Sequence, residues 1–131
     1  MEYSIAQVSE KMNLPSYTLR YYEKEGLLPS IQRGKGGVRR FSEQDLDWLG
    51  LICCLKSTGM PIRQIRKFVD LSRQGETTLK QRCEMLAAHR QSVEKHIELM
   101  EKQLQKVTCK IECFTAQYED YRGRQRHNSG A

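Results

Sequence analysis

The chain has 131 residues, 38% of them hydrophobic and 8% aromatic, and its 22 lysines and arginines against 16 acidic residues give a net charge of +6. This length supports one small domain plus an appendage, and the positive charge favours a polyanionic partner such as nucleic acid. No apolar run approaches the roughly 18 residues of a membrane span, and the N-terminus lacks the pattern of a signal peptide. We therefore expect a cytoplasmic protein with no membrane partner.

Two short helices are predicted at the N-terminus. Ser4 opens the capping-box pattern S-I-A-Q, which predicts a helix over residues 5–12. Ser16 can cap a second helix over residues 17–24, which Gly26 ends. Two short helices joined by a tight turn are typical of a helix-turn-helix.

The next stretch, QRGKGGVRRFS, predicts a small β-hairpin, or wing, over about residues 30–42 because three glycines lie between short flanks. Four basic residues are concentrated in this stretch: Arg33, Lys35, Arg39 and Arg40. Ser42 can cap a third helix over residues 43–57, and Pro61 suits the first turn of a fourth helix over residues 61–72.

A long amphipathic helix is predicted from residue 79 onward, because one set of positions recurs at alternating spacings of four and three. Apart from Arg90, these positions are Leu79, Cys83, Leu86, Val93, Ile97, Met100, Leu104, Val107, Ile111, Phe114 and Tyr118. A heptad stripe over roughly 60 Å of helix needs a partner, so we expect a homodimer. The periodicity alone leaves parallel and antiparallel arrangements open. The expected organisation is a DNA-binding domain (1–75), a dimerisation helix (76–121) and a basic, disordered tail (122–131).

The second helix presents candidate DNA contacts. Arg20, Tyr21 and Lys24 lie on its polar side, where a helix in the major groove offers side chains to phosphates and base edges. The alternative is a solvated helix in which Arg20 forms an ordinary ion pair with Glu23 or Glu25.

In this order and spacing, YSIAQVSEKMNLPSYTLRYYEKEGLLP, RRFSEQDLDWL, LKSTGMPIRQI and a long terminal helix resemble the MerR family of transcriptional regulators over about residues 3–118. The resemblance implies a mainly α fold, with an N-terminal winged helix-turn-helix domain followed by a long C-terminal helix that forms an antiparallel coiled-coil dimer. It also implies a dimer that bends and untwists double-stranded promoter DNA so that RNA polymerase can engage both promoter elements. The candidate DNA contacts are then Ser16, Tyr17, Thr18, Arg20, Tyr21, Lys24, Lys35, Arg39 and Arg40.

The adjacent cysteines of LICCLKSTGM point about 100° apart on a helix and so differ in role. Cys53 lies on the apolar side of the helical wheel and Cys54 on the polar side, although Lys56 would favour a thiolate at Cys53. CLKSTGMP is similar to a branch of the family that responds to aldehydes, other electrophiles or nitrosative stress through a cysteine. That position is Cys54 here, with Cys53 as the secondary candidate and a dual-thiol mechanism still open.

Three alternatives remain for the cysteines. A metal-responsive regulator would use Cys109 and Cys113, with Cys83 from the other subunit, although Cys83 in the stripe also suits an apolar filler. A disulfide would join Cys53 or Cys54 to one of those three cysteines. An architectural DNA binder would leave all five inert. A thiol enzyme lacks support because the chain has no CxxC motif, so we expect a regulator rather than an enzyme, with a reactive small-molecule inducer and no cofactor. His89 and His96 are expected on the surface.

Overall fold

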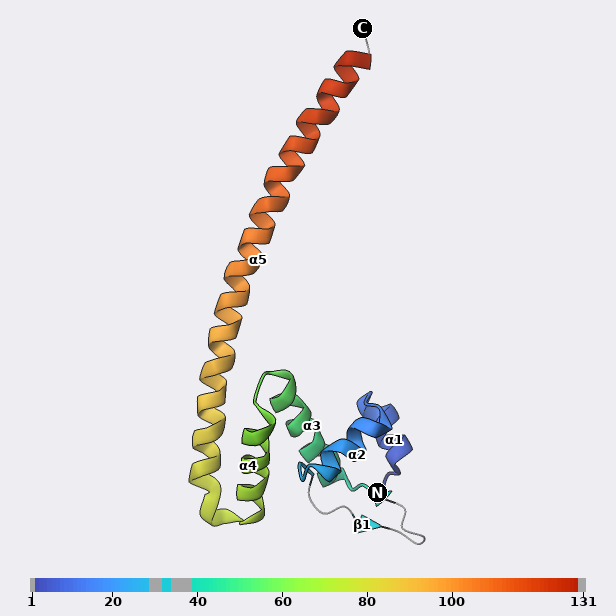
Figure 1. Ribbon diagram of the computed structural model, residues 1–131, viewed down its shortest axis with the longest axis vertical. Coiled ribbons are helices and arrows are strands. Elements are labelled where there is room, and N and C mark those ends of the chain that lie inside the picture. The colour runs from blue at the N-terminus through green and yellow to red at the C-terminus, as the bar shows by residue number, and fades with distance from the viewer. Residues whose placement is uncertain (1, 29–31, 34–38, 130–131) are drawn as a thin grey trace. The chain divides into compact units, whose positions relative to one another are not determined.

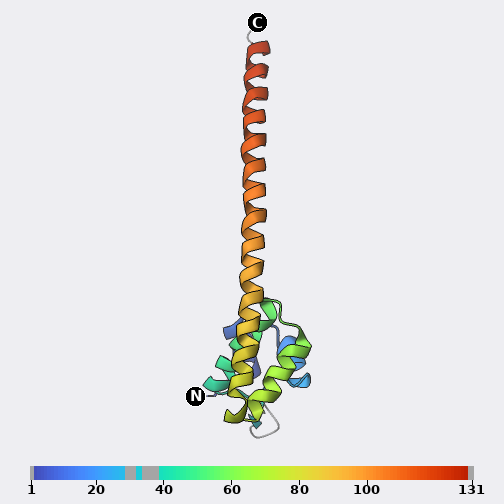
Figure 2. The same cartoon turned by 90° about the vertical axis from the view of Figure 1, so that its left-hand side faces the viewer.

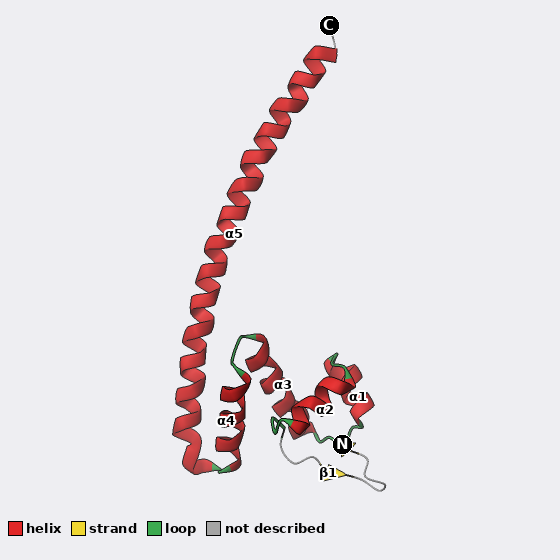
Figure 3. Cartoon of the chain, viewed as in Figure 1, coloured by secondary structure: helices red, strands yellow, loops and turns green. Residues whose placement is uncertain are grey.

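The computed structural model describes residues 2–28, 32–33 and 39–129. Helices dominate the described part of the chain, as Figures 1 and 3 show. The elements in order are α1 (Ile5–Met12), α2 (Ser16–Lys24), β1 (Gln32–Arg33), β2 (Arg39–Arg40), α3 (Glu43–Ser57), α4 (Ile62–Arg73), the 3-10 helix η2 (Glu76–Thr78) and α5 (Leu79–Ser129). The chain divides into two compact units, residues 1–90 (unit 1) and residues 91–131 (unit 2).

The first two helices form the predicted helix-turn-helix. The Ser4 side chain and the Gln7 side chain complete the capping box of α1. Helix α2 begins one residue earlier than predicted: Ser16 is its first residue and Pro15 precedes it without a side-chain cap, so the prediction of a Ser16 cap is wrong. Proline suits this place because the fixed backbone angle and the missing N–H cost nothing before the first turn.

A glycine ends α2 and turns the chain toward the wing. Gly26 has φ +74°, and the Leu27 amide donates to the Tyr22 carbonyl oxygen at 2.9 Å while the Gly26 amide donates to Glu23 at 3.1 Å. This pair of bonds is the Schellman motif, which requires a left-handed residue after the helix.

The wing is a two-stranded antiparallel hairpin in which Gln32 pairs with Arg40 and Arg33 with Arg39. Tyr3 extends it, because its backbone exchanges two hydrogen bonds of 2.8 Å with Phe41. The described strands thus confirm the predicted hairpin, while its predicted tip, including Lys35, lies outside the described residues.

Unit 1 has one hydrophobic core shared by α1 to α4 and the segments between them. Its fully buried large side chains are Val8, Leu19, Leu27, Phe41, Leu49, Ile52, Ile65 and Val69. Ser42 and Asp45 form the capping box that begins α3. Helix α4 begins at Ile62, one residue after the expected start, with Pro61 before its first turn.

The corner between α4 and α5 is held by polar contacts around Thr78. This side chain is 3% exposed, and its hydroxyl donates to the Leu71 carbonyl oxygen at 2.6 Å. Arg82 of α5 donates to the Thr78 hydroxyl at 3.1 Å and to the Gly75 carbonyl oxygen at 2.9 Å. The first turns of α5 therefore lie beside α4, as Figures 1 and 2 show from two directions.

Leu86 differs from the rest of the predicted stripe. It and Met85 are partly buried against the core of unit 1, so in this chain Leu86 contributes to the packing of its own domain.

Unit 2 is helical throughout its described residues, because α5 continues to Ser129. The expectation that residues 122–131 are disordered is therefore wrong for residues 122–129. Seven stripe residues of unit 2 are between 51% and 65% exposed: Ile97, Met100, Leu104, Val107, Ile111, Phe114 and Tyr118. We call these seven residues the α5 stripe. Among the described residues, no helix is long and apolar enough to cross a membrane.

Candidate DNA-binding surface and cysteine site

Helix α2 presents four exposed side chains in one row. Tyr17, Arg20, Tyr21 and Lys24 follow the spacing i, i+3, i+4, i+7 and all four are exposed. Tyr17 is 73% exposed and Tyr21 is 45% exposed, which is unusual for aromatic side chains in a small domain. Hydroxyl and cationic groups in one row suit contacts to a phosphate backbone and to base edges.

The opposite side of α2 fixes this row in place. Leu19 and Tyr22 are buried in the core. Ser16 and Thr18, also candidate contacts, are half-buried. The helix is thus anchored on its apolar side and exposed on its polar side, as a recognition helix requires.

The wing carries one basic side chain that the structure describes. Arg40 is exposed at the end of β2. The backbone of Arg39 pairs with Arg33, whereas the Arg39 side chain and the whole of Lys35 lie outside the described residues. Of the predicted wing contacts, the structure therefore places Arg40 alone.

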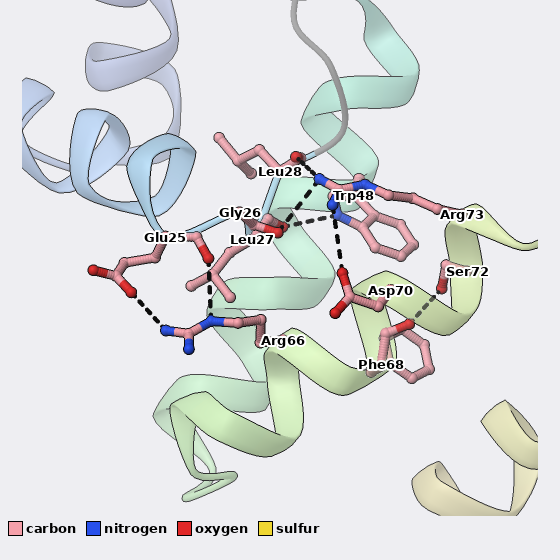
Figure 4. Close-up of polar contacts among 10 residues, drawn as sticks. All are labelled: Glu25, Gly26, Leu27, Leu28, Trp48, Arg66, Phe68, Asp70, Ser72 and Arg73. Atoms are coloured by element: carbon pink, nitrogen blue, oxygen red, sulfur yellow. Dashed lines mark hydrogen bonds and ion pairs between the residues drawn. The ribbon is translucent and has the colours of Figure 1, made fainter.

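Three residues that the sequence analysis missed surround the end of α2, as Figure 4 shows. Trp48 donates to the Leu27 carbonyl oxygen, and its ring stacks on Phe68 with 5.9 Å between centroids. Arg66 bonds Glu25, one of the residues considered as an ion-pair partner for Arg20, with 2.5 Å between the guanidinium and the carboxylate oxygen. Arg73 reaches the same segment from the end of α4.

These residues had only a weak signal in the sequence. Trp48, Arg66 and Arg73 lie 21 to 47 positions from the residues after α2 whose carbonyl oxygens they bond, so no local spacing pairs them. The available clue was EGLL itself, a non-helical stretch whose backbone needs hydrogen-bond partners once its two leucines are buried.

The two adjacent cysteines on α3 have different environments. Cys54 is exposed, whereas Cys53 is half-buried and packs against the core. Burial raises the pKa of the Cys53 thiol above its usual range, so Lys56 does not offset the loss of solvent. Tyr22 is a neighbour of Cys53, and its own pKa is raised by burial first and then by Cys53 and Tyr21. Cys54 is therefore the more accessible nucleophile.

The C-terminal end of α3, which carries Cys54, is linked to α5. The Thr58 hydroxyl lies 2.7 Å from the Cys54 carbonyl oxygen and 2.7 Å from Nε2 of His89. Because the single hydroxyl proton goes to the carbonyl, Nε2 of His89 is the donor to Thr58. His89 is half-buried, so the expectation of a surface histidine is wrong.

The other three cysteines do not form a metal site within one chain. Cys83, Cys109 and Cys113 are exposed on α5, and Cys113 accepts a weak hydrogen bond from Gln117 at 3.5 Å. Within the residues that the structure describes, no three His, Cys, Asp or Glu side chains are placed to hold a metal ion.

A helix-turn-helix with an exposed basic and aromatic row, a following hairpin and a long amphipathic helix defines a winged helix-turn-helix DNA-binding protein. Comparison with protein families gives the same class. Residues 3–71 match the MerR HTH family regulatory protein model, and residues 46–108 match the model described as MerR, DNA binding. The chain belongs to the MerR family of transcriptional regulators.

Individual relatives agree with this assignment. An HTH-type transcriptional regulator of Haemophilus influenzae is 39% identical over 111 residues, which cover 85% of this chain and 72% of the relative. The HTH-type transcriptional regulator AdhR of Bacillus subtilis is 36% identical over 67% of this chain and 63% of its own length.

A solved structure is also similar. HiNmlR, described as a MerR family regulator lacking the sensor domain and bound to promoter DNA, superposes with a TM-score of 0.81 at 37% identity. The match covers 85% of this chain and 88% of HiNmlR. The chain is thus a DNA-binding transcriptional regulator, and its relatives are regulators rather than enzymes, as the sequence predicts.

Proposed function

We propose that the chain acts in the cytoplasm as a homodimer that distorts promoter DNA and that Cys54 is the group through which it senses electrophiles. Aldehydes, other reactive carbonyl compounds and nitrosating or oxidising species are the expected inducers, because a thiolate is the nucleophile toward all of them. The observation that carries the proposal is the exposure of Cys54 beside a half-buried Cys53 with a raised pKa.

The α5 stripe supports the homodimer. Seven large apolar side chains on one face of a helix are more than half exposed in the single chain, and a second α5 would cover them. An antiparallel arrangement is the one that the MerR family implies. The predicted interface also includes Leu79, Cys83 and Val93, with a smaller share for Leu86 because it packs on its own domain.

The DNA-binding surface supports the distortion of the promoter. Bending a DNA site of about 20 to 30 base pairs costs of order 1 to 6 kcal/mol. Contacts from the two recognition helices and two wings of a dimer must offset this cost. Charge-assisted contacts from Arg20, Lys24 and Arg40 of each subunit supply favourable energy that falls as salt rises.

The contacts at the end of α3 support a route from Cys54 to α5. A group added to the Cys54 sulfur changes the size and polarity of the last turn of α3, and the backbone oxygen of the same residue accepts from Thr58, which in turn bonds His89. A small change at this turn would therefore alter the orientation of the domain on α5 and bias the two DNA-binding domains of the dimer.

The test compares Cys54→Ser with Cys53→Ser, a matched control at the next residue. Each variant controls a promoter reporter while cells receive methylglyoxal, a nitric oxide donor or hydrogen peroxide, and mass spectrometry of the purified protein identifies the first modified thiol. We expect Cys54 to be modified first, Cys53→Ser to respond, and Cys54→Ser to lose the response.

Two results would contradict the sensing proposal. The first is a Cys54→Ser variant that still responds to every inducer while Cys53→Ser does not. The second is an unchanged response in a cysteine-free variant, which would favour a DNA binder without a thiol effector. Stoichiometric zinc or copper in the reduced protein, lost in Cys109→Ser with Cys113→Ser, would instead favour the metal-responsive alternative.

A further inference from the structure

The segment between the recognition helix and the wing has an unusual set of backbone contacts. In residues 25–28, which we call the linker segment, four consecutive carbonyl oxygens each accept a hydrogen bond from a side chain of α3 or α4. Figure 4 shows these donors converging on the linker segment from the two helices.

Each donor has a defined target. Arg66 Nε donates to the Glu25 oxygen at 3.2 Å, and Trp48 Nε1 donates to the Leu27 oxygen at 3.1 Å. One nitrogen of Arg73, Nη2, lies 2.8 Å from the Leu28 oxygen and 3.4 Å from the Gly26 oxygen. Asp70 holds the other end of the Arg73 guanidinium at 3.5 Å.

The second half of the linker segment needs these donors because it is buried, and among the described residues it has no strand partner. Leu27 is 0% exposed and Leu28 is 4% exposed, so the side chains draw the backbone toward the core. Backbone carbonyls brought near the core require hydrogen-bond partners. An arginine suits this place because its planar fork of donors can bond several oxygens from a fixed position, which a lysine ammonium does not reproduce.

The placement of the linker segment matters for DNA binding because it directly follows α2. Glu25 and Gly26 are the first two residues after the helix that carries Arg20, Tyr21 and Lys24. Helix α4 is in turn tied to the start of α5 through Thr78 and Arg82. The contacts therefore link α5, α4 and the C-terminal end of the recognition helix within unit 1.

We propose that Arg66, Arg73 and Trp48 are positioning residues for DNA binding: they fix the end of α2 on α3 and α4, so that the recognition helix moves with these two helices. The proposal rests on the assignment of α2 as the DNA-contacting helix and is independent of any role for Cys54. The two arginines act here through the linker segment rather than through the DNA.

The decisive variant is Arg73→Lys, which keeps the charge and removes the fork. The probe is a duplex that the wild-type protein selects from a random library, and the full-length protein is titrated at fixed salt. If Arg73 contacted a phosphate, the lysine variant would largely keep its affinity for the duplex. If Arg73 is a positioning residue, Arg73→Lys should weaken duplex binding about tenfold. Lys67→Ala is the matched control, because it removes one exposed positive charge from the same helix, and it should change affinity less than Arg73→Lys.

A double-mutant cycle with Arg20→Ala separates positioning from a general loss of stability. Distant residues that act independently have additive effects, whereas a misplaced α2 already weakens the Arg20 contact. The tenfold effect of Arg73→Lys should therefore fall to about threefold in the Arg20→Ala background. Additive effects at a temperature where all four proteins are folded would overturn the inference.

Trp48→Phe provides a milder second variant if Arg73→Lys is unfolded. It keeps a ring against Phe68 and removes the N–H that bonds Leu27. The same weaker affinity and the same coupling to Arg20 are expected, and wild-type affinity would count against the inference. If Arg20→Ala itself leaves affinity and salt dependence unchanged, the assignment of α2 as the DNA-contacting helix fails instead.

Discussion

At the scale of single residues, the clearest division is between the two cysteines of α3. They are adjacent in the sequence and share one helix, yet Cys54 is exposed and Cys53 packs against the core. The difference follows from the rotation of about 100° between neighbouring helical residues. Burial disfavours the charged form of a thiol, so it raises the pKa of Cys53 and lowers the fraction of thiolate at neutral pH.

The burial of Cys53 predicts how the alkylation of its thiol depends on pH. In a variant that retains Cys53 alone, alkylation by iodoacetamide should have its midpoint at a higher pH in the folded protein than in the protein unfolded in urea. Since the unfolded state loses the proton first, the contribution of the buried thiol to stability is complete below the unfolded pKa and is lost as pH rises through the folded pKa. Mass spectrometry of the alkylated fraction against pH measures both midpoints, and a folded midpoint equal to or below the unfolded one would contradict this account.

At the scale of helices, local signals predicted most of the boundaries. Ser4 and Ser42 form the expected capping boxes, because a cap depends on residues only three positions apart. Ser16 also resembles a cap, but it lies inside α2 because Pro15 occupies the position before the helix. The charge and glycine content of residues 122–129 suggested disorder, yet Gly123 does not interrupt α5.

The contacts between helices could not be predicted in the same way. The link from Thr58 to His89 spans 31 positions, and the contacts of Arg66 and Arg73 with residues 25–28 span more than 40. Single-sequence patterns report which face of a helix is apolar, but they do not say which polar side chain on one helix meets which backbone group of another. The exposed row on α2 was predictable because it depends only on which face of that helix is polar. The linker contacts were missed because they pair side chains with the backbone of a distant segment.

The Thr58–His89 contact predicts a measurable coupling between α3 and α5. Thr58→Val keeps the shape of the side chain and removes the hydroxyl, so it should lower the free energy of unfolding by about 1 kcal/mol. His89→Ala should lower it as well, and the double variant should cost less than the sum because both changes remove the same hydrogen bond. Urea unfolding followed by circular dichroism measures each value.

Ser57→Ala is the control for that cycle. Its hydroxyl also donates to the Cys54 carbonyl oxygen, at 3.1 Å, but from an exposed position that is not bonded to His89. Ser57→Ala should lower the free energy of unfolding only slightly, and this loss should add to that of His89→Ala. Additive losses for Thr58→Val and His89→Ala would show that the two side chains do not stabilise the domain through one contact.

At the scale of the whole molecule, the proposed mechanism requires α2 to be linked through α4 to the start of α5. The recognition helix is followed by the linker segment, the linker segment is held by α4, and α4 is joined to α5 by Thr78 and Arg82. In the proposed mechanism Cys54 acts on this arrangement at the end of α3. A change that alters the placement of α4 on α5 would therefore reach the DNA without any direct contact between the inducer and the recognition helix.

The α5 stripe allows the proposed dimer to be tested with a single substitution. Leu104 is 64% exposed in the single chain, and Leu104→Glu would place a charge in the proposed interface, where its desolvation opposes association. Sedimentation equilibrium should show a shift from dimer to monomer. Affinity for the selected duplex should fall, because a monomer has one recognition helix where the dimer has two. Gln105→Glu adds the same charge at the next residue, which points about 100° away from Leu104 and lies outside the α5 stripe, and it should leave the protein dimeric. A wild-type protein that is monomeric at micromolar concentration, or a Leu104→Glu variant that remains a dimer, would rule out this stripe as the dimer interface.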